Sequence, residues 1–370
     1  MPRRRVTVTH APIPFRTTFK HASASRRIAE NVIVTIEDED GVVGFGEGCP
    51  RHYVTGETRE SAQVFLERNA NSVAAEVDSV ADLRTWISGN REIDANPSAV
   101  CALELALLDF LGRRAAVPIE ALLGLEPVAV SPQATAVYGD SSSVAFAVQF
   151  AVFGFNRLLS SKLKLSGDRR RDGRRAGLLA RRGPLRLDAN NLWPDAAAAI
   201  AALAPLARSA WAVEEPVKAH DFESMAKISR ETGLTIVLDE SFLTTADLDA
   251  VPTDGTFAVN VRVSKLGGLI RTLNLVRDAK ARGLKIVIGA QVGETSILAR
   301  AGLVAVRAAS EAMVGYEGGY GTHLLAHDVC EPSLTFGRRG VFSAGNLRRL
   351  SQPGLGLDPI FLPEVSVPWQ

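Results

Sequence analysis

Short, β-rich apolar runs alternate with helical stretches from about residue 130 to about residue 330. The centres of the candidate strands lie near Ala136, Leu163, Leu187, Val213, Leu238, Val259, Val287 and Gly315. Neighbouring centres are 21 to 28 residues apart. Eight near-equal strand–helix units predict an α/β fold with a parallel (β/α)₈ TIM-type barrel. A doubly wound open sheet is the alternative, but no GxGxxG motif follows a strand.

The flanking segments have a different pattern. Residues 31–36 and 42–46 are β-rich and are separated by a turn, which predicts a hairpin. Apolar residues recur at helical spacing from Pro97 to Gly112 and predict a helix. After Glu331 the chain becomes irregular and rich in Pro and Gly. We therefore expect an α+β capping domain over 1–128, the barrel over 129–330, and a C-terminal segment, 331–370, that returns to the capping domain.

Composition and charge narrow the class of protein. The 370 residues contain 42 Lys and Arg against 41 Asp and Glu, and 46% are hydrophobic. Such balance is ordinary for a globular protein and argues against a nucleic-acid partner. Three separated cysteines without a CxxC predict neither disulfides nor a zinc site. Residues 1–15 lack the apolar core of a signal peptide, and the Ala-rich run 196–207 is too short to cross a bilayer, so we expect a cytoplasmic protein with no membrane partner.

Residues 168–186 contain eight arginines, at positions 169, 170, 171, 174, 175, 181, 182 and 186. Nucleic-acid grooves usually interleave such charges with aromatic residues, and none occurs here. The run predicts a solvated outer helix of the barrel.

Charged residues recur where the predicted strands end. Lys164, Asp188, Glu214, Asp239 and Lys265 follow one another at steps of 24 to 26 residues. Because active sites of such barrels lie at the carboxyl ends of the strands, these five side chains are expected to share one mouth.

Three carboxylates that point inward together would repel one another unless a cation joined them. Oxygen ligands favour a hard divalent ion, and Mg²⁺ fits best. Three unrelated surface acids at loop starts are the alternative, although the matched phase favours the metal site.

Three lysines lie on two sides of this predicted centre. Lys162 and Lys164 share one face of their strand, so each is expected to lower the pKa of the other, as a lysine base requires. Lys265 comes from the opposite strand of the ring. This arrangement suits removal of a proton next to a carboxylate.

The ordered motifs KLK (162–164), LDAN (187–190), EEP (214–216), DES (239–241) and KLGG (265–268) resemble the enolase superfamily, in the branch of muconate lactonizing enzymes. GFGE at 44–47, the helix at 98–112 with Glu104 and Asp109, and PGLG at 353–356 extend the resemblance over nearly the whole chain.

The resemblance implies a role for each matching residue. Asp188, Glu214 and Asp239 would bind Mg²⁺, with Mn²⁺ as an alternative ion. Lys164 and Lys265 would be the acid and base, with Lys162 as electrostatic partner of Lys164. The supporting and substrate-binding groups implied are Asn190, Glu240 (paired with Lys265), Glu294 and Glu317. The implied partners are a small-molecule carboxylate and further copies of the chain.

Two departures leave the reaction open. Glu215 stands where the branch often has Gln, and Glu317 is the single acid where dipeptide epimerases carry DxD. The expected activity is that of a racemase, epimerase or cycloisomerase acting α to a carboxylate. A syn-dehydratase of succinylbenzoate synthase type and a non-catalytic binding protein on the same barrel are the alternatives.

Overall fold

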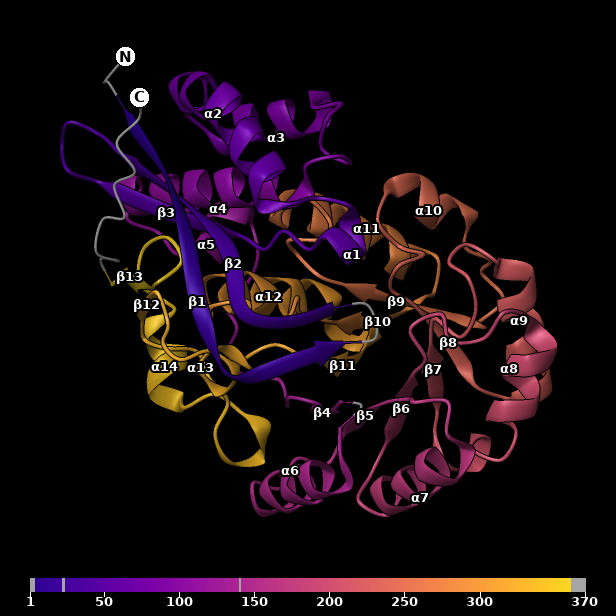
Figure 1. The fold of residues 1–370 in the computed structure, drawn as a ribbon. Helices are drawn as coiled ribbons and strands as arrows, with labels where there is room; N and C mark the ends of the chain where they lie inside the picture. Colours follow the sequence, from indigo (N-terminus) through magenta and orange to yellow (C-terminus); the bar gives the residue numbers. More distant parts are fainter. Residues whose placement is uncertain (1–3, 22–23, 140, 361–370) are drawn as a thin grey trace.

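The computed structural model describes residues 4–21, 24–139 and 141–360, and its centre is a curled sheet of eight parallel strands (Figure 1). Their order in the sheet follows the chain. The strands are β4 (Ala136–Tyr138), β5 (Ser161–Lys164), β6 (Leu185–Asp188), β7 (Ala212–Glu214), β8 (Thr235–Leu238), β9 (Phe257–Val261), β10 (Lys285–Ile288) and β11 (Met313–Tyr316). Each contains one of the predicted centres. The Thr135 amide donates to the Tyr316 carbonyl at 2.7 Å, which brings the two edges of the sheet together.

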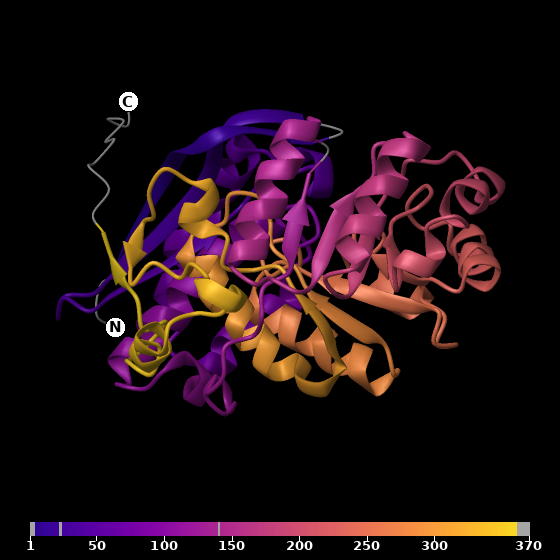
Figure 2. The ribbon, with the colours of Figure 1, turned by 90° about the horizontal axis from the view of Figure 1, so that it is seen from below.

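Helices cover the outer face of the sheet, as Figures 1 and 2 show. They are α6 (Ser143–Phe155), α7 (Arg169–Ala180), α8 (Ala196–Leu203), α9 (Phe222–Thr232), α10 (Thr245–Ala250), α11 (Leu269–Ala281) and α12 (Ser296–Ala309). Inside the barrel, Ala212, Val237, Ala258 and Val287 form a small apolar cluster separate from the main core. Because side chains alternate along a strand, the residues two positions later also point inward, nearer the carboxyl ends.

The N-terminal domain is an antiparallel sheet packed on helices. Its strands are β1 (Arg5–His21), β2 (Ala24–Glu37) and β3 (Val43–Gly48), and its helices are α1 (His52–Thr55), α2 (Arg59–Glu76), α3 (Val80–Gly89), α4 (Pro97–Arg114) and α5 (Ile119–Leu123). The pairing of β2 with β3 confirms the predicted hairpin. Helix α4 is buried from Pro97 to Gly112 because it lies between this sheet and the barrel.

The C-terminal segment contains α13 (Gly321–Leu324), β12 (Cys330–Glu331), α14 (Ala344–Arg349) and β13 (Asp358–Pro359). It contacts the N-terminal domain through several hydrogen bonds, of which two lie beside α4 and α5. The Ile119 amide donates to the Gly354 carbonyl at 2.8 Å, and the Leu355 amide donates to Asp109 Oδ1 at 2.7 Å. The predicted residues 361–370 of this segment lie outside the described part of the chain.

The arginine run is only partly solvated. Arg169, Arg170 and Arg174 are exposed on α7, as expected. The prediction is wrong for Arg175, which is buried with its guanidinium 4.7 Å from the centre of the Phe146 ring, and for Arg186, which is 2% exposed. Arg186 belongs to β6, two residues before Asp188, so the alternation of the strand turns it into the barrel.

No helix in the described ranges has the length and apolar character needed to cross a membrane.

Candidate active site

The carboxyl ends of four neighbouring strands supply most of the charged cluster. β5 carries Lys162 and Lys164, β6 carries Asp188, and β7 ends on Glu214. Asp239 follows β8 directly. Parallel pairing sets Lys164 beside Asp188 and Asp188 beside Glu214 in register. The five side chains just named are buried or nearly so, which confines their charges to one mouth of the barrel.

Lys162 lies at the centre of this cluster. Its Nζ is 3.3 Å from Asp188 Oδ2, 3.3 Å from Glu214 Oε1 and 3.1 Å from Glu317 Oε1. The lysine is 3% exposed. A buried ammonium is tolerated only with such compensation, so Lys162 holds carboxylates from three strands around one point.

Two arginines and an asparagine join the cluster, and the sequence interpretation missed all three. Arg186 pairs with Glu317, and its Nε is 3.1 Å from Glu214 Oε2. Arg262 pairs with Asp239 and lies 3.7 Å from Glu214 Oε1. Asn260 Nδ2 donates to the same Glu214 oxygen at 3.1 Å. Each of these three residues lies two positions from another residue that points into the barrel. This spacing is the sequence signal that could have identified them.

The predicted acid–base lysines stand at different carboxylates. Lys164 Nζ is 3.2 Å from Asp188 Oδ2 and donates to Asn190 Oδ1 at 2.9 Å. Lys265 Nζ donates at 2.8 Å to Asp239 Oδ1 and at 2.9 Å to the Asn260 carbonyl. Asp188 and Asp239 belong to strands separated by β7, so the two amines flank the acids from two sides.

Burial and neighbouring charges tune these groups. Burial lowers the pKa of Lys265, and the nearby Arg262 charge lowers it further, against the pull of Asp239. Burial alone would raise the pKa of Asp188, but Lys164 and Lys162 outweigh it and hold that pKa below the ordinary range. Arg262 and Lys265 do the same for Asp239. Both aspartates are therefore anionic at neutral pH.

The three predicted metal ligands lie close together but are shared with cations of the protein. Over the described ranges, no three His, Cys, Asp or Glu side chains are arranged as a ready metal site. Lys162 and Arg262 stand among the three acids. Both carboxylate oxygens of Asp188 are buried and accept no well-formed hydrogen bond from the described residues. Asp188 Oδ2 is in ion contact with Lys162 and Lys164, and buried carboxylate oxygens of this kind are hard donors that fit Mg²⁺.

Glu215 has a structural explanation. Its Oε1 accepts the amides of Asp239 and Ser241, each at 2.7 Å, and its Oε2 accepts Ser241 Oγ at 2.9 Å. Burial raises its pKa to about 7. Glu215 thus holds the loop that carries Asp239.

The remaining predicted site residues differ in their surroundings. Glu317 is 5% exposed and paired with Lys162 and Arg186. Glu294 accepts the Gln291 amide at 2.6 Å, and burial raises its pKa to about 8. Burial and Asp239 raise the pKa of Glu240 to about 8. Within the described residues Glu240 has no hydrogen bond to Lys265, whose ionic partner is Asp239.

Comparison with known proteins agrees with this fold and site. Residues 146–360 match the family described as "Enolase C-terminal domain-like", and residues 3–124 match the "Mandelate racemase / muconate lactonizing enzyme, N-terminal domain". Together the two matches cover most of the barrel and the N-terminal domain, and they show that the chain is of the enolase class of enzymes. The chain belongs to the mandelate racemase/muconate lactonizing enzyme branch of that superfamily.

Three relatives illustrate the branch. A hydrophobic dipeptide epimerase of Enterococcus faecalis is 30% identical over 306 residues, 80% of this chain and 84% of the relative. An N-succinyl-L-Arg/Lys racemase of Bacillus cereus is 25% identical over 78% of this chain and 80% of its own. A chloromuconate cycloisomerase of Cupriavidus pinatubonensis is 26% identical over 93% of both. All three are isomerases, which is the class of enzyme predicted for this chain.

Solved structures of two of these proteins share the fold. The racemase superposes with a TM-score of 0.83 at 22% identity, covering 97% of this chain and 96% of its own. The epimerase, complexed with Mg and the dipeptide L-Leu-L-Tyr, superposes with a TM-score of 0.80 at 24% identity and covers 97% of this chain and 100% of its own.

Proposed function

We propose that the chain is a metal-dependent racemase or epimerase that removes and returns the proton α to a substrate carboxylate. The observation that carries this proposal is the placement of two amines, the largely buried Lys164 and the fully buried Lys265, on two sides of one group of carboxylates. A reaction that inverts a carbon centre needs one group on each face, and this pair supplies both.

Asp188, Glu214 and Asp239 would hold the metal, which we propose is Mg²⁺. When bound, the ion supplies positive charge beside the substrate carboxylate and lowers the cost of the negative charge that develops there. The solved complex of the Enterococcus epimerase with Mg and L-Leu-L-Tyr supports the choice of ion.

The lysines perform the proton transfer. Lys164 takes the α proton on one face, and Lys265 delivers a proton to the other face; the reverse direction exchanges the roles. Asn190 orients Lys164, while Asp239 and the Asn260 carbonyl orient Lys265. Lys162 stays between the carboxylates and keeps their charges compatible in the buried mouth.

The substrate class follows from Glu317. This acid already neutralises Lys162 and Arg186, so a substrate ammonium would have to compete with two buried cations for it. We therefore expect amino acids with an acylated nitrogen to be better substrates than dipeptides with a free amine.

The test is proton exchange in D₂O, followed by ¹H NMR and chiral chromatography on N-acyl amino acids and dipeptides with Mg²⁺. The wild type is expected to incorporate deuterium at the α carbon and to lose optical purity. Lys164→Ala and Lys265→Ala should each reduce racemisation about 10²–10⁴-fold. Each variant should still exchange the one enantiomer whose proton faces the remaining lysine.

Lys218→Ala, an exposed lysine outside the cluster, is the control and should behave as wild type. EDTA should abolish exchange. Full racemisation by both site variants, or loss of water instead of deuterium uptake, would overturn the proposal.

A further inference from the structure

We propose that Glu104 of the N-terminal domain is a positioning residue that fixes the loop carrying Lys265. This inference rests on the proposed function, because it takes Lys265 as a proton-transfer group. It assigns the N-terminal domain a direct part in placing that group.

Lys265 stands on a tight loop between β9 and α11. The Leu266 amide donates to the Arg262 carbonyl at 3.1 Å, and the Gly268 amide donates to the Val263 carbonyl at 3.0 Å. The loop ends on two glycines with positive φ, +83° at Gly267 and +111° at Gly268. So short a segment has few ways to move unless the start of α11 moves with it.

Glu104 holds the start of α11. Its Oε2 accepts the Leu269 amide at 2.6 Å, and its Oε1 accepts the Ile270 amide at 2.7 Å. The residue is fully buried in α4. Gly268, the cap residue of α11, offers no side chain of its own, so the carboxyl group supplied by α4 satisfies two otherwise orphan N–H groups.

Gly268 is what allows this approach. A Cβ on Gly268 would overlap Glu104 Oε2. The KLGG sequence therefore links the catalytic lysine to a glutamate 161 to 164 residues earlier in the chain. The lysine and its glycines act as one unit with α4.

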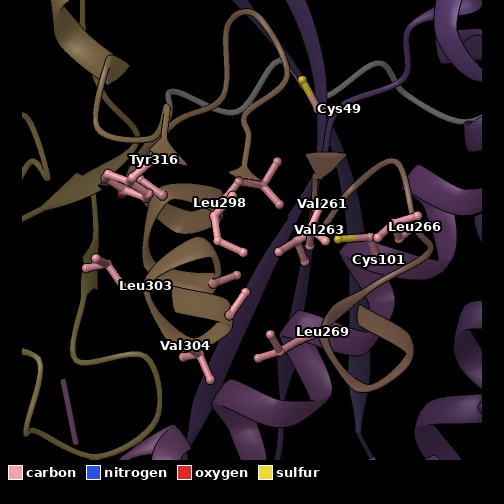
Figure 3. Packing of buried hydrophobic residues seen from close by; sticks show 14 of the residues in the cluster. Cys49, Cys101, Val261, Val263, Leu266, Leu269, Leu298, Leu303, Val304 and Tyr316 are labelled. Carbon is pink, nitrogen blue, oxygen red and sulfur yellow. The ribbon is translucent and has the colours of Figure 1, made fainter. Parts of the chain in front are cut away.

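Other residues of the N-terminal domain also contact the loop that carries Lys265. The Cys49 amide donates to Ser264 Oγ at 2.9 Å, and Ile93 fills the space where Gly267 would carry a side chain. Cys101 of α4 and the loop residues Val263 and Leu266 belong to one buried apolar cluster, part of which Figure 3 shows. The loop is thus fixed on one side by the barrel and on the other by the N-terminal domain.

Loss of the Glu104 anchor is expected to affect the chemical step more than substrate binding. Lys265 would keep its charge and its partner Asp239, but its backbone would be less restrained. Small displacements of a catalytic group reduce rates steeply. We expect Glu104→Ala to lower kcat about 10–100-fold with KM within about threefold of wild type.

Glu57 provides a matched control. It is 1% exposed, lies in the same domain, and also accepts two helix-start amides, those of Ser98 at 2.8 Å and Ala99 at 3.0 Å in α4. Glu57→Ala should lower thermal stability as Glu104→Ala does, yet leave kcat within about twofold of wild type. Glu104→Gln retains an acceptor oxygen and should recover part of the lost kcat.

Hydrogen–deuterium exchange separates this inference from the proposed function, because it needs no turnover. Peptides covering residues 262–272 should exchange faster in Glu104→Ala and unchanged in Glu57→Ala. Unchanged exchange there, or equal loss of kcat in both alanine variants, would overturn the positioning role. An inactive wild type with the expected exchange pattern would overturn the proposed function alone and support the anchor.

Discussion

Lys162 and Arg186 carry two positive charges into the barrel beside Glu317, and all three side chains are at most 5% exposed. Glu317→Gln keeps the shape but removes the charge that both cations share. Breaking a buried ion pair by removing one partner is costly because the other charge stays buried. We expect the free energy of unfolding, measured by urea denaturation without added metal, to fall by about 3–5 kcal/mol.

The exposed pair Arg349–Asp358 serves as a control for this measurement. Asp358→Asn removes a carboxylate of the same kind from a solvated pair, where screening leaves little net attraction. Its urea midpoint should match that of the wild type. A Glu317→Gln variant as stable as the wild type would mean that Glu214 and Asp188 suffice to compensate both cations.

Individual site residues were predictable from the sequence only where a charged residue recurs at the same position in successive strand–helix units. Lys164, Asp188 and Glu214 recur at one phase, and the structure places them side by side. Arg186 and Arg262 did not stand out, because an inward position two residues earlier or later is recognisable only once the strand limits are fixed. The arginine run before β6 masked Arg186 further.

At the scale of elements, β3 and α4 are in unusually close contact. Gly44, Gly46 and Gly48 alternate along β3, and a Cβ on any of them would overlap the backbone of α4. The close packing of β3 on α4 therefore requires glycine, whose side chain is a single hydrogen atom, at these three positions. Their φ angles are not positive.

Gly46→Ala should destabilise the protein by at least about 1–3 kcal/mol, because the added methyl meets the Ala102 carbonyl and the Ala106 amide, which cannot move independently of α4. Gly89→Ala is the comparison: this glycine ends α3 with open space around it, and alanine favours helix. Guanidinium unfolding followed by circular dichroism would measure both. Equal midpoints for the two variants would contradict the close packing of β3 on α4.

Elements were predictable where their pattern is local. The eight strands follow from a regular period, and the hairpin follows from a turn between two β-rich runs. The anchoring of α11 and α12 by the N-terminal domain was not predictable. Glu104 accepts the Leu269 amide, 165 residues later in the chain, and Glu47 accepts the Thr295 amide, 248 residues later. Neither helix start carries a sequence signal for a cap from another domain.

At the scale of the molecule, buried acids join the N-terminal domain to the rest of the chain. Burial raises the pKa of Glu104 to about 8, that of Glu47 to about 7 and that of Asp109 to about 6, against their backbone hydrogen bonds. Glu104 and Glu47 bond the barrel helices, and Asp109 bonds the C-terminal segment. Proton binding and the joining of the domains are therefore linked.

The sign of that linkage fixes the pH dependence of stability. These folded-state pKa values lie above the ordinary 4.5 for Glu and 3.8 for Asp, so the folded protein holds protons that the unfolded chain releases. The contribution of these three carboxyl groups to the free energy of unfolding is complete below about pH 4 and is lost as the pH rises through about 6 to 8. Asp188 and Asp239 act oppositely, and their contribution is lost only in acid.

We therefore expect the metal-free protein to be most stable in mildly acidic buffer, with Tm falling from pH 6 to pH 9 in a thermal-shift series. Glu104→Gln carries no titrating proton, so its Tm should fall less steeply, whereas Glu39→Gln, at an exposed position, should follow the wild type. A Tm that rises over this range would show that the buried carboxyls are ionised in the folded state. Their bonds to helix starts would then outweigh burial, and the junction between the domains would be held by charge.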